Sequence, residues 1–99
     1  MAANVHAYEL VVILSPELDD DGVTAGIEKV HQAVTSRGGQ IEDVNNWGRR
    51  RLAYPIKRHL EGTYVLTQMK MDPGQVRDLE DNLRISEEVI RHLVVRTDG

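Results

Sequence analysis

The chain lacks cysteine, has few aromatic residues and contains no long apolar run, and these absences exclude several classes of protein. Without cysteine it can form neither a disulfide nor a thiolate ligand or nucleophile. No apolar run approaches the ~20 residues that a membrane-spanning helix needs, so we expect no membrane segment. The first residues lack the charged start and the apolar stretch of a secretory signal, so we expect a cytoplasmic protein.

Motifs for catalysis and for metal binding are missing as well. The four histidines lie far apart, without a neighbouring ligand at the spacing of a metal site. The sequence contains no glycine-rich phosphate loop and no GxSxG nucleophile motif. The run Asp19–Asp21 could hold a hard cation, but acidic residues at the start of a helix explain it more simply. We therefore expect no enzyme, cofactor, metal or small-molecule substrate.

What the chain does have is a core-sized share of apolar residues and an uneven distribution of charge. Its 99 residues, 40% of them hydrophobic, suffice for one domain spanning residues 1–99. The net charge is −4, yet residues 1–48 carry eight acidic and two basic side chains, whereas residues 49–99 carry eight acidic and ten basic ones. This asymmetry indicates a polarised surface with one side suited to nucleic acid.

The basic residues concentrate in one segment, Arg49–Arg58, which holds five cations and no acid within ten residues. Arginine forks match phosphate geometry and stay charged at physiological pH, so Arg49, Arg50 and Arg51 are candidate phosphate ligands. Lys57 and Arg58 would add to them at a turn. The alternative is an exposed edge strand whose charges prevent aggregation, and the pattern alone leaves both interpretations open.

Hydrophobic patterning predicts the order strand, helix, strand, strand, helix, strand. The strands are expected at His6–Leu14, Gln40–Ile56, Thr63–Met71 and Val89–Arg96, with a turn at His59–Gly62. Gly48 should mark a bulge in the second strand. Pro55, which has no N–H to donate, should lie at an edge of the sheet or near the end of the strand, and an edge strand fits the topology predicted below.

Two helices are expected between these strands. Asp19–Asp21 begin the first, and Gly38-Gly39 ends it. Asp72 and Pro73 supply a cap and a first-turn proline for the second. This βαββαβ order predicts a ferredoxin-like α+β sandwich, in which a four-stranded antiparallel sheet of order 4-1-3-2 carries both helices on one face.

The opposite face of that sheet would be bare. The alternation of side chains along a strand places Val11 with Ile13, and Tyr64 with Leu66. The sequence does not decide which set of side chains the helices cover, and we take these four as the uncovered set. They are candidates for a partner-binding patch, although scattered apolar residues are also common on protein surfaces.

The run Arg50–Ile56 reads RRLAYPI, and several other segments accompany it. These segments are Tyr8-Glu9, Leu14–Pro16, Gly38-Gly39, Glu61–Tyr64 and Leu83–Ile85. In order and spacing they resemble the bacterial ribosomal protein S-six family, the sixth protein of the small ribosomal subunit, and the run Arg50–Ile56 resembles the signature of that family. The resemblance implies a structural protein of the cytoplasmic ribosome that binds small-subunit ribosomal RNA together with small-subunit protein eighteen, and so supports platform assembly and translation.

The resemblance also implies roles for single residues. It adds Arg84 and Arg91 to the RNA-facing positions, which then comprise Arg49, Arg50, Arg51, Lys57, Arg58, Arg84 and Arg91. It implies that the bare sheet face helps to dock protein eighteen. Ser86 departs from the family, which often has a basic residue there. The third strand offers only Tyr64 as an aromatic, so we expect recognition of folded RNA by shape and backbone rather than by stacking on single-stranded bases.

The residues alone leave two other functions open. One is a homo-oligomeric ferredoxin-like domain that senses a small ligand and dimerises through the bare sheet face. The other is a small enzyme that acts on acyl phosphates. That enzyme would need a phosphate-cradling loop after the first strand, and Leu14–Glu17 contains neither glycine nor arginine.

Overall fold

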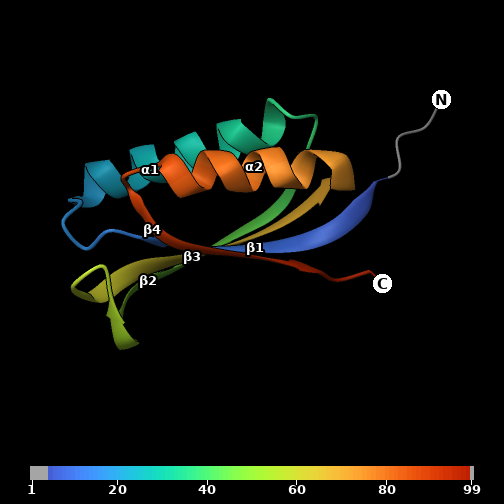
Figure 1. The fold of residues 1–99 in the computed structure, drawn as a ribbon. Coiled ribbons are helices and arrows are strands. Elements are labelled where there is room, and N and C mark those ends of the chain that lie inside the picture. Colours follow the sequence, from blue (N-terminus) through green and yellow to red (C-terminus); the bar gives the residue numbers. More distant parts are fainter. Residues whose placement is uncertain (1–4, 99) are drawn as a thin grey trace.

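A four-stranded sheet carries two helices on one of its faces (Figure 1). The computed structural model describes residues 5–98. The elements in chain order are β1 His6–Leu14, α1 Asp20–Thr35, β2 Gln40–Ile56, β3 His59–Met71, α2 Pro73–Ile85 and β4 Val89–Arg96. All strand pairs are antiparallel, and the order across the sheet is β2-β3-β1-β4. The predicted ferredoxin-like sandwich is confirmed, with β2 at an edge as Pro55 indicated.

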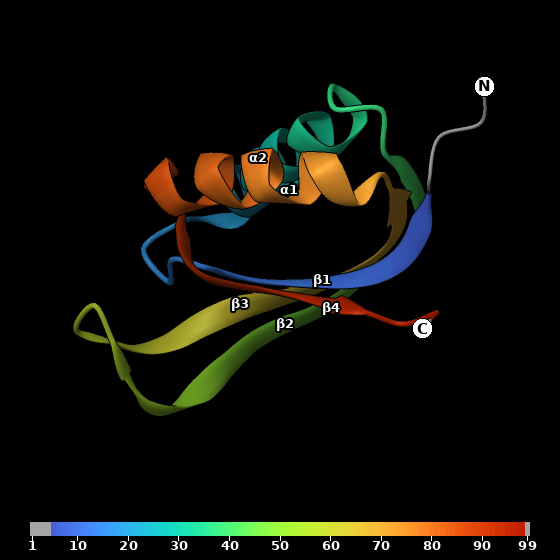
Figure 2. The same cartoon turned by 45° about the vertical axis from the view of Figure 1, so that its right-hand side comes forward.

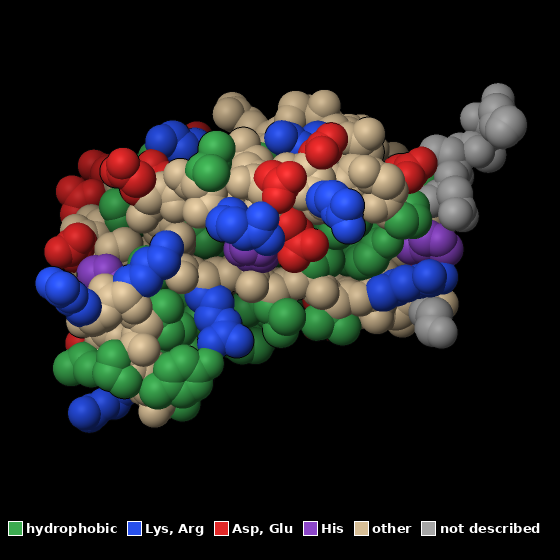
Figure 3. All heavy atoms as spheres, viewed as in Figure 1, with side chains coloured by type: hydrophobic (Ala, Val, Ile, Leu, Met, Phe, Trp, Pro, Cys, Tyr) green, Lys and Arg blue, Asp and Glu red, His purple; other side chains and the backbone are tan. Residues whose placement is uncertain are grey.

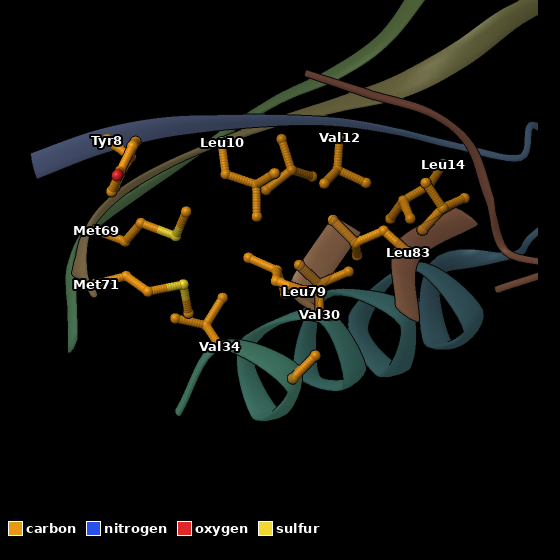
Figure 4. Packing of buried hydrophobic residues seen from close by; sticks show 13 residues of the cluster. Tyr8, Leu10, Val12, Leu14, Val30, Val34, Met69, Met71, Leu79 and Leu83 are labelled. Atoms are coloured by element: carbon orange, nitrogen blue, oxygen red, sulfur yellow. The ribbon is translucent and has the colours of Figure 1, made fainter. Parts of the chain in front are cut away.

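The main core lies between the sheet and the helices (Figure 4). Tyr8, Leu10, Val12 and Leu14 alternate along β1, and each is at most 7% exposed. They meet Met69 and Met71 of β3, Val30 and Val34 of α1, and Leu79 and Leu83 of α2. Because neighbouring strand residues point to opposite faces, Val11 and Ile13 face away from the helices. The structure thus identifies the bare face as the one that bears these two residues.

Both helices begin where their capping residues predicted. The side chain of Asp19 accepts a hydrogen bond from the backbone N of Gly22 (2.7 Å), and that of Asp72 accepts one from Gly74 (2.7 Å). Pro73 occupies the first turn of α2, where a missing N–H costs nothing. After α1 the chain turns at Gly38, whose φ of +78° suits glycine.

The prediction of the turn between β2 and β3 was wrong. The chain reverses at Lys57 and Arg58, whose φ values are +48° and +71°, and Ile56 pairs with His59. Strand β3 therefore starts at His59 rather than Thr63, and His59–Gly62 is strand rather than turn. Two-residue hairpin turns need left-handed backbone, which usually selects Asn or Gly, so a Lys-Arg pair gave no turn signal.

The outer end of the β2–β3 hairpin curls away from the helix layer, toward the bare side of the sheet (Figure 2). There Ile13, Leu52 and Ile90 form a second small cluster, each at most 8% exposed. Gly62 permits this close approach, because a Cβ at that position would overlap the side chain of Ile13 and lie 3.1 Å from the Leu14 carbonyl oxygen. The predicted irregularity at Gly48 is also confirmed, since the register shifts there and its φ is +80°.

The first and last strands are tied together at the other end of the sheet. Asp98 accepts hydrogen bonds from the backbone N of Ala7 (2.9 Å) and from Nε of Arg96 (2.9 Å). The backbone N of Thr97 donates to the Ala7 carbonyl oxygen (2.9 Å). The bond from Ala7, followed by that from Arg96, lowers the pKa of Asp98 from 3.8 to about 2. We call this group of contacts the terminal clasp.

Candidate functional site

Three of the basic residues singled out in the sequence surround one hollow, which we call the basic hollow. Lys57 comes from the hairpin turn, Arg84 from the last turn of α2, and Arg91 from β4. The hollow has a volume of about 240 Å³. Its remaining wall consists of Leu83, Val89, Ile90 and His92. Residues far apart in sequence converge here because the hairpin end folds over the sheet toward β4.

The cations of the basic hollow are accessible. Lys57, Arg84 and Arg91 are all exposed. Arg84 pairs with Asp81 through Nη1 and Oδ1 at 2.8 Å, but both side chains are more than 60% exposed. An ion pair so exposed contributes at most about 1 kcal/mol, so a phosphate could compete for Arg84 at little cost.

Glu88, an acid that follows the end of α2, is engaged in contacts of its own. Ser86 caps α2, and its hydroxyl donates to Oε2 of Glu88 (2.7 Å), while Nζ of Lys29 donates to Oε1 (2.8 Å). The hydrogen bond from Lys29, followed by that from Ser86, lowers the pKa of Glu88 from 4.5 to about 2. Glu88 therefore stays charged at neutral pH, but Lys29 offsets much of its repulsion toward an anion near Arg84.

The three consecutive arginines have different surroundings. In the β2–β3 register Arg49 lies opposite Thr63, Arg50 opposite Gly62 and Arg51 opposite Glu61. This regular register keeps Arg49 and Arg51 on one side of the strand and Arg50 on the other.

The guanidinium of Arg49 makes polar contacts within the protein. Arg50 and Arg51 are exposed on the hairpin edge. Nη2 of Arg49 donates to the Pro16 carbonyl oxygen (2.7 Å), and Nη1 lies 4.0 Å from Oε1 of Glu61. The guanidinium of Arg50 lies over the ring of Trp47, 5.5 Å from its centroid.

The acidic side chains are unevenly distributed over the face shown in Figure 3. In this view Asp and Glu lie mainly over the helix layer, where Lys and Arg accompany them, whereas the lower half, formed by the hairpin end and the sheet, shows mostly Lys and Arg among apolar side chains. The sequence predicted a polarised surface from the uneven distribution of charge. Asp20 and Asp21 place part of the acidic charge at the start of α1, whereas the basic cluster lies on β2 and at the hairpin turn.

The bare face carries the predicted apolar patch in a modified form. Val11, Tyr64 and Leu66 are half-buried, and Val11 pairs with Leu66 across β1 and β3. Ile13 is only 5% exposed, because Leu52 and Ile90 cover it, so it supports this face from beneath.

Sequence reasoning did not assign three large apolar residues of this region to the patch. Leu93 is 52% exposed, Val95 44% and Trp47 44%. Alternation along β4 could have identified Leu93 and Val95, since they pair with Val11 and Glu9. Trp47 stacks on Tyr64 with ring centroids 6.4 Å apart and an angle of 14° between the planes, a contact that depends on the bulge near Gly48.

A second hollow of about 270 Å³, the apolar hollow, opens on this face. Its lining consists of Val11, Ile13, Leu52, Ala53, Tyr54, Ile56, Tyr64, Arg91, His92 and Leu93. At its edge the guanidinium of Arg91 donates to the Tyr54 hydroxyl and lies 5.9 Å from the centroid of the Tyr54 ring. The bare face is thus not flat but offers a concave apolar site beside a cation.

Within residues 5–98, no three His, Cys, Asp or Glu side chains are grouped so as to hold a metal ion. The helices in this range are all too short or too polar to cross a membrane. His31 is half-buried between α1 and the sheet, where its Nε2 lies 3.2 Å from the Thr67 hydroxyl. Burial lowers its pKa below 6.5.

The fold and its cationic surface define a small ferredoxin-like α+β sandwich with a basic hairpin and an uncovered apolar face. The family model for ribosomal protein S6 matches residues 7–96 of this sequence. The chain belongs to the ribosomal protein S6 family, and with it to the structural proteins of the small ribosomal subunit. The family is not one of enzymes, and its members reside on the cytoplasmic ribosome, as the resemblance implied.

Individual relatives support this assignment. Small ribosomal subunit protein bS6 of Moorella thermoacetica is 41% identical over 91 residues, which cover 92% of this chain and 93% of the relative. The protein of the same description from Mycolicibacterium paratuberculosis is 45% identical over 91 residues, covering 92% and 95%.

Solved structures agree on the fold. The crystal structure of 30S ribosomal protein S6 from Thermotoga maritima has a TM-score of 0.89 and 28% identity, and the match covers 95% of this chain and 89% of that one. The C-terminal domain of the MgtC protein from Mycobacterium tuberculosis has a TM-score of 0.65 at 13% identity, covering 100% and 95%. This second match shows only that the two chains share a fold.

Proposed function

We propose that this protein binds folded small-subunit ribosomal RNA through its basic residues and small-subunit protein eighteen through its bare sheet face, and so supports assembly of the platform. The observation that carries the RNA part is the basic hollow, where Lys57, Arg84 and Arg91 meet from three separate elements. Three cations around one concave site suit a phosphate of the RNA backbone. Membership of the ribosomal protein S6 family supports the same conclusion.

The other basic residues extend this surface. Arg50 and Arg51 project from the edge strand β2, and Arg58 lies beside Lys57 at the hairpin turn. Arg49 adds its charge, although one of its nitrogens is held by Pro16. Contacts of this kind position a protein on RNA and release counterions, so binding should weaken steeply as salt rises.

The bare face is the proposed site for protein eighteen. Its apolar side chains, among them Val11, Tyr64 and Leu66 with Ile13 beneath, are enough to form the centre of a protein interface rimmed by polar residues. A basic partner there would also offset the net charge of −4, which otherwise opposes binding to RNA. We further propose that residues 1–99 act as one domain, because both helices and all four strands contribute to the same core.

The test is binding to a central-domain fragment of small-subunit RNA, with and without purified protein eighteen, at two salt concentrations. Tight and salt-sensitive binding in the presence of the partner is expected. The double variant Lys57→Ala/Arg84→Ala should reduce the slope of log affinity against log salt, by about 0.9 for each phosphate whose contact is lost.

The matched control is Arg77→Ala. Arg77 is an exposed arginine on the same helix as Arg84 but lies outside the lining of the basic hollow. Its loss should leave the salt slope unchanged. An equal slope for the double variant and the unaltered protein would contradict the assignment of the basic hollow to RNA.

A further inference from the structure

The basic hollow and the apolar hollow adjoin each other at β4. Arg91 and His92 belong to the lining of both. His92 contacts α2, where its Nε2 lies 3.4 Å from Oε2 of Glu80. Arg91 is instead held by Tyr54, whose hydroxyl accepts its hydrogen bond and whose ring lies against its guanidinium. The Arg91–Tyr54 pair therefore stands at the boundary between a site suited to an anion and a site suited to an apolar group.

We infer that the Arg91–Tyr54 pair couples the two hollows. An apolar side chain of the protein partner fills the apolar hollow and fixes this pair, and the fixed Arg91 then binds an RNA phosphate in the basic hollow more strongly. This inference rests on the proposed function and adds to it a physical route by which one ligand strengthens the binding of the other.

The lining of the apolar hollow selects an apolar side chain. Val11, Ile13 and Leu93 offer only hydrocarbon, and the rings of Tyr54 and Tyr64 add aromatic faces. On this wall the Tyr54 hydroxyl already accepts a hydrogen bond from Nη1 of Arg91, so few polar groups remain for the hydrogen-bonding edges of a nucleobase. A volume of about 270 Å³ leaves room for an apolar side chain of the partner.

The hollow is continuous with the rest of the proposed protein interface. Leu93 and Val11 belong both to its wall and to the exposed patch on the bare face, where Val11 pairs with Leu66. A partner that binds to this patch can therefore place a side chain in the hollow from the same interface. Well-packed concave sites near the centre of an interface are where anchoring side chains contribute most.

Coupling follows from the exposure of the pair, which only one hydrogen bond and one ring contact hold together. Tyr54 is 56% exposed and Arg91 is exposed as well, so a ligand in either hollow restricts both side chains further. The ligand that arrives first orders the pair, and the second ligand then binds to a side chain that is already ordered. The result is positive coupling between partner and RNA, on the order of 5-fold or more.

The experiment measures the factor by which saturating protein eighteen increases the affinity for the RNA fragment, in the unaltered protein and in Tyr54→Phe. This substitution keeps the ring and removes the hydroxyl that holds Arg91. We expect the factor to fall toward 1. The same factor must be obtained from the partner's affinity with and without RNA, because coupling is reciprocal.

Two further variants separate coupling from simple loss of affinity. Arg84→Ala should weaken RNA binding equally with and without the partner. Arg84 belongs to the lining of the basic hollow but not to that of the apolar hollow. Arg91→Lys keeps the charge but not the planar fork, so it should preserve the salt slope and still reduce the coupling factor. Arg91→Lys also replaces Tyr54→Phe as the test if the latter fails to fold.

The outcomes distinguish this inference from the function on which it rests. An unchanged coupling factor in both Tyr54→Phe and Arg91→Lys overturns the inference and leaves the proposed function standing. A complete lack of RNA binding, even with the partner present, overturns both. A reduced factor in the two variants, together with an unchanged factor in Arg84→Ala, supports the coupling.

Discussion

Individual side chains of the same type have different roles in this protein because their surroundings differ. Arg49 and Arg50 are neighbours in the sequence, yet Arg49 donates to the Pro16 carbonyl oxygen whereas Arg50 lies on Trp47. The contact of Arg49 joins β2 to the loop between β1 and α1. Charge alone would assign the two residues the same role.

Arg49→Ala should therefore reduce stability more than Arg50→Ala does. We expect Arg49→Ala to lower the free energy of unfolding by about 0.5–1 kcal/mol, since a partly exposed hydrogen bond from a charged donor is lost. Arg50→Ala should instead reduce the salt slope of RNA binding by about 0.9. Urea unfolding and RNA titration of both variants check this. A larger stability loss for Arg50→Ala would contradict it.

His31 makes stability depend on pH. Burial lowers its pKa below the ordinary 6.5, so the unfolded chain binds a proton here at a higher pH than the folded protein does. The contribution of His31 is fully present above about pH 6.5 and is lost as pH falls below it, by at most about 1.4 kcal/mol per pH unit. Urea unfolding between about pH 7.5 and about pH 5.5 covers the range in which an ordinary histidine titrates.

The control for His31 is His31→Gln, which does not titrate and can still bond to Thr67. This variant should show a weaker pH dependence across the same range. Glu88 and Asp98 do not interfere, because their pKa values fall from 4.5 and 3.8 to about 2, so their contributions are lost only at lower pH. Identical pH profiles for the variant and the unaltered protein would rule out His31 as the cause.

Among the elements, the β2–β3 hairpin combines the strongest charge with a strained turn. Lys57 and Arg58 both adopt positive φ, a conformation that side chains with a Cβ rarely take. Asn and Gly are the residues usually found at such a turn. The strained pair nevertheless places one cation in the basic hollow and another beside it. This is consistent with turn residues that favour ligand binding at a cost in folding stability.

Replacing the turn by Asn-Gly should stabilise the protein and weaken its binding to RNA. We expect Lys57→Asn/Arg58→Gly to raise the free energy of unfolding by about 1 kcal/mol, because the left-handed strain is relieved. The control is Lys57→Ala/Arg58→Ala, which removes the same charges and keeps the strain. Thermal unfolding should show a gain for the first variant alone, while RNA titration should show similar losses for both.

The sequence predicted the elements well and the sites only in part. The helix caps at Asp19 and Asp72 and the alternation along β1 are local signals. The order of the elements and the main core could therefore be predicted from the sequence. The turn at Lys57-Arg58 could not, because its conformation is imposed by strand pairing. The basic hollow depends on the hairpin end folding over the sheet, a tertiary event that leaves no trace in spacing.

Considered as a whole, the molecule is elongated, with principal extents of 45 × 25 × 22 Å, and its two layers differ in charge. The acidic helix layer and the cationic hairpin give it a polarity that should orient it as it approaches RNA. Its bare face also raises the question of self-association, which the rival function as a homo-oligomeric sensor requires.

We expect the isolated protein to be a monomer at micromolar concentration. The apolar hollow is edged by Arg91 and the hairpin carries Arg50, so two bare faces brought together would oppose like charges. Light scattering or sedimentation, without RNA, measures the state directly. A stable homodimer would favour the sensor. Leu93→Glu, which places a charge on the same face, should leave a monomer unchanged and would dissociate such a dimer.

The terminal clasp has a practical consequence for how these experiments are built. Asp98 holds Ala7 and Arg96 together at one end of the long axis, and the hairpin turn lies at the opposite end (Figure 1). A fluorophore or a surface tether attached beyond either strand end would therefore stand away from both hollows. Immobilised through such a handle, the protein would present its cationic hairpin outward to the solution, so the attachment itself would select the face that ligands meet.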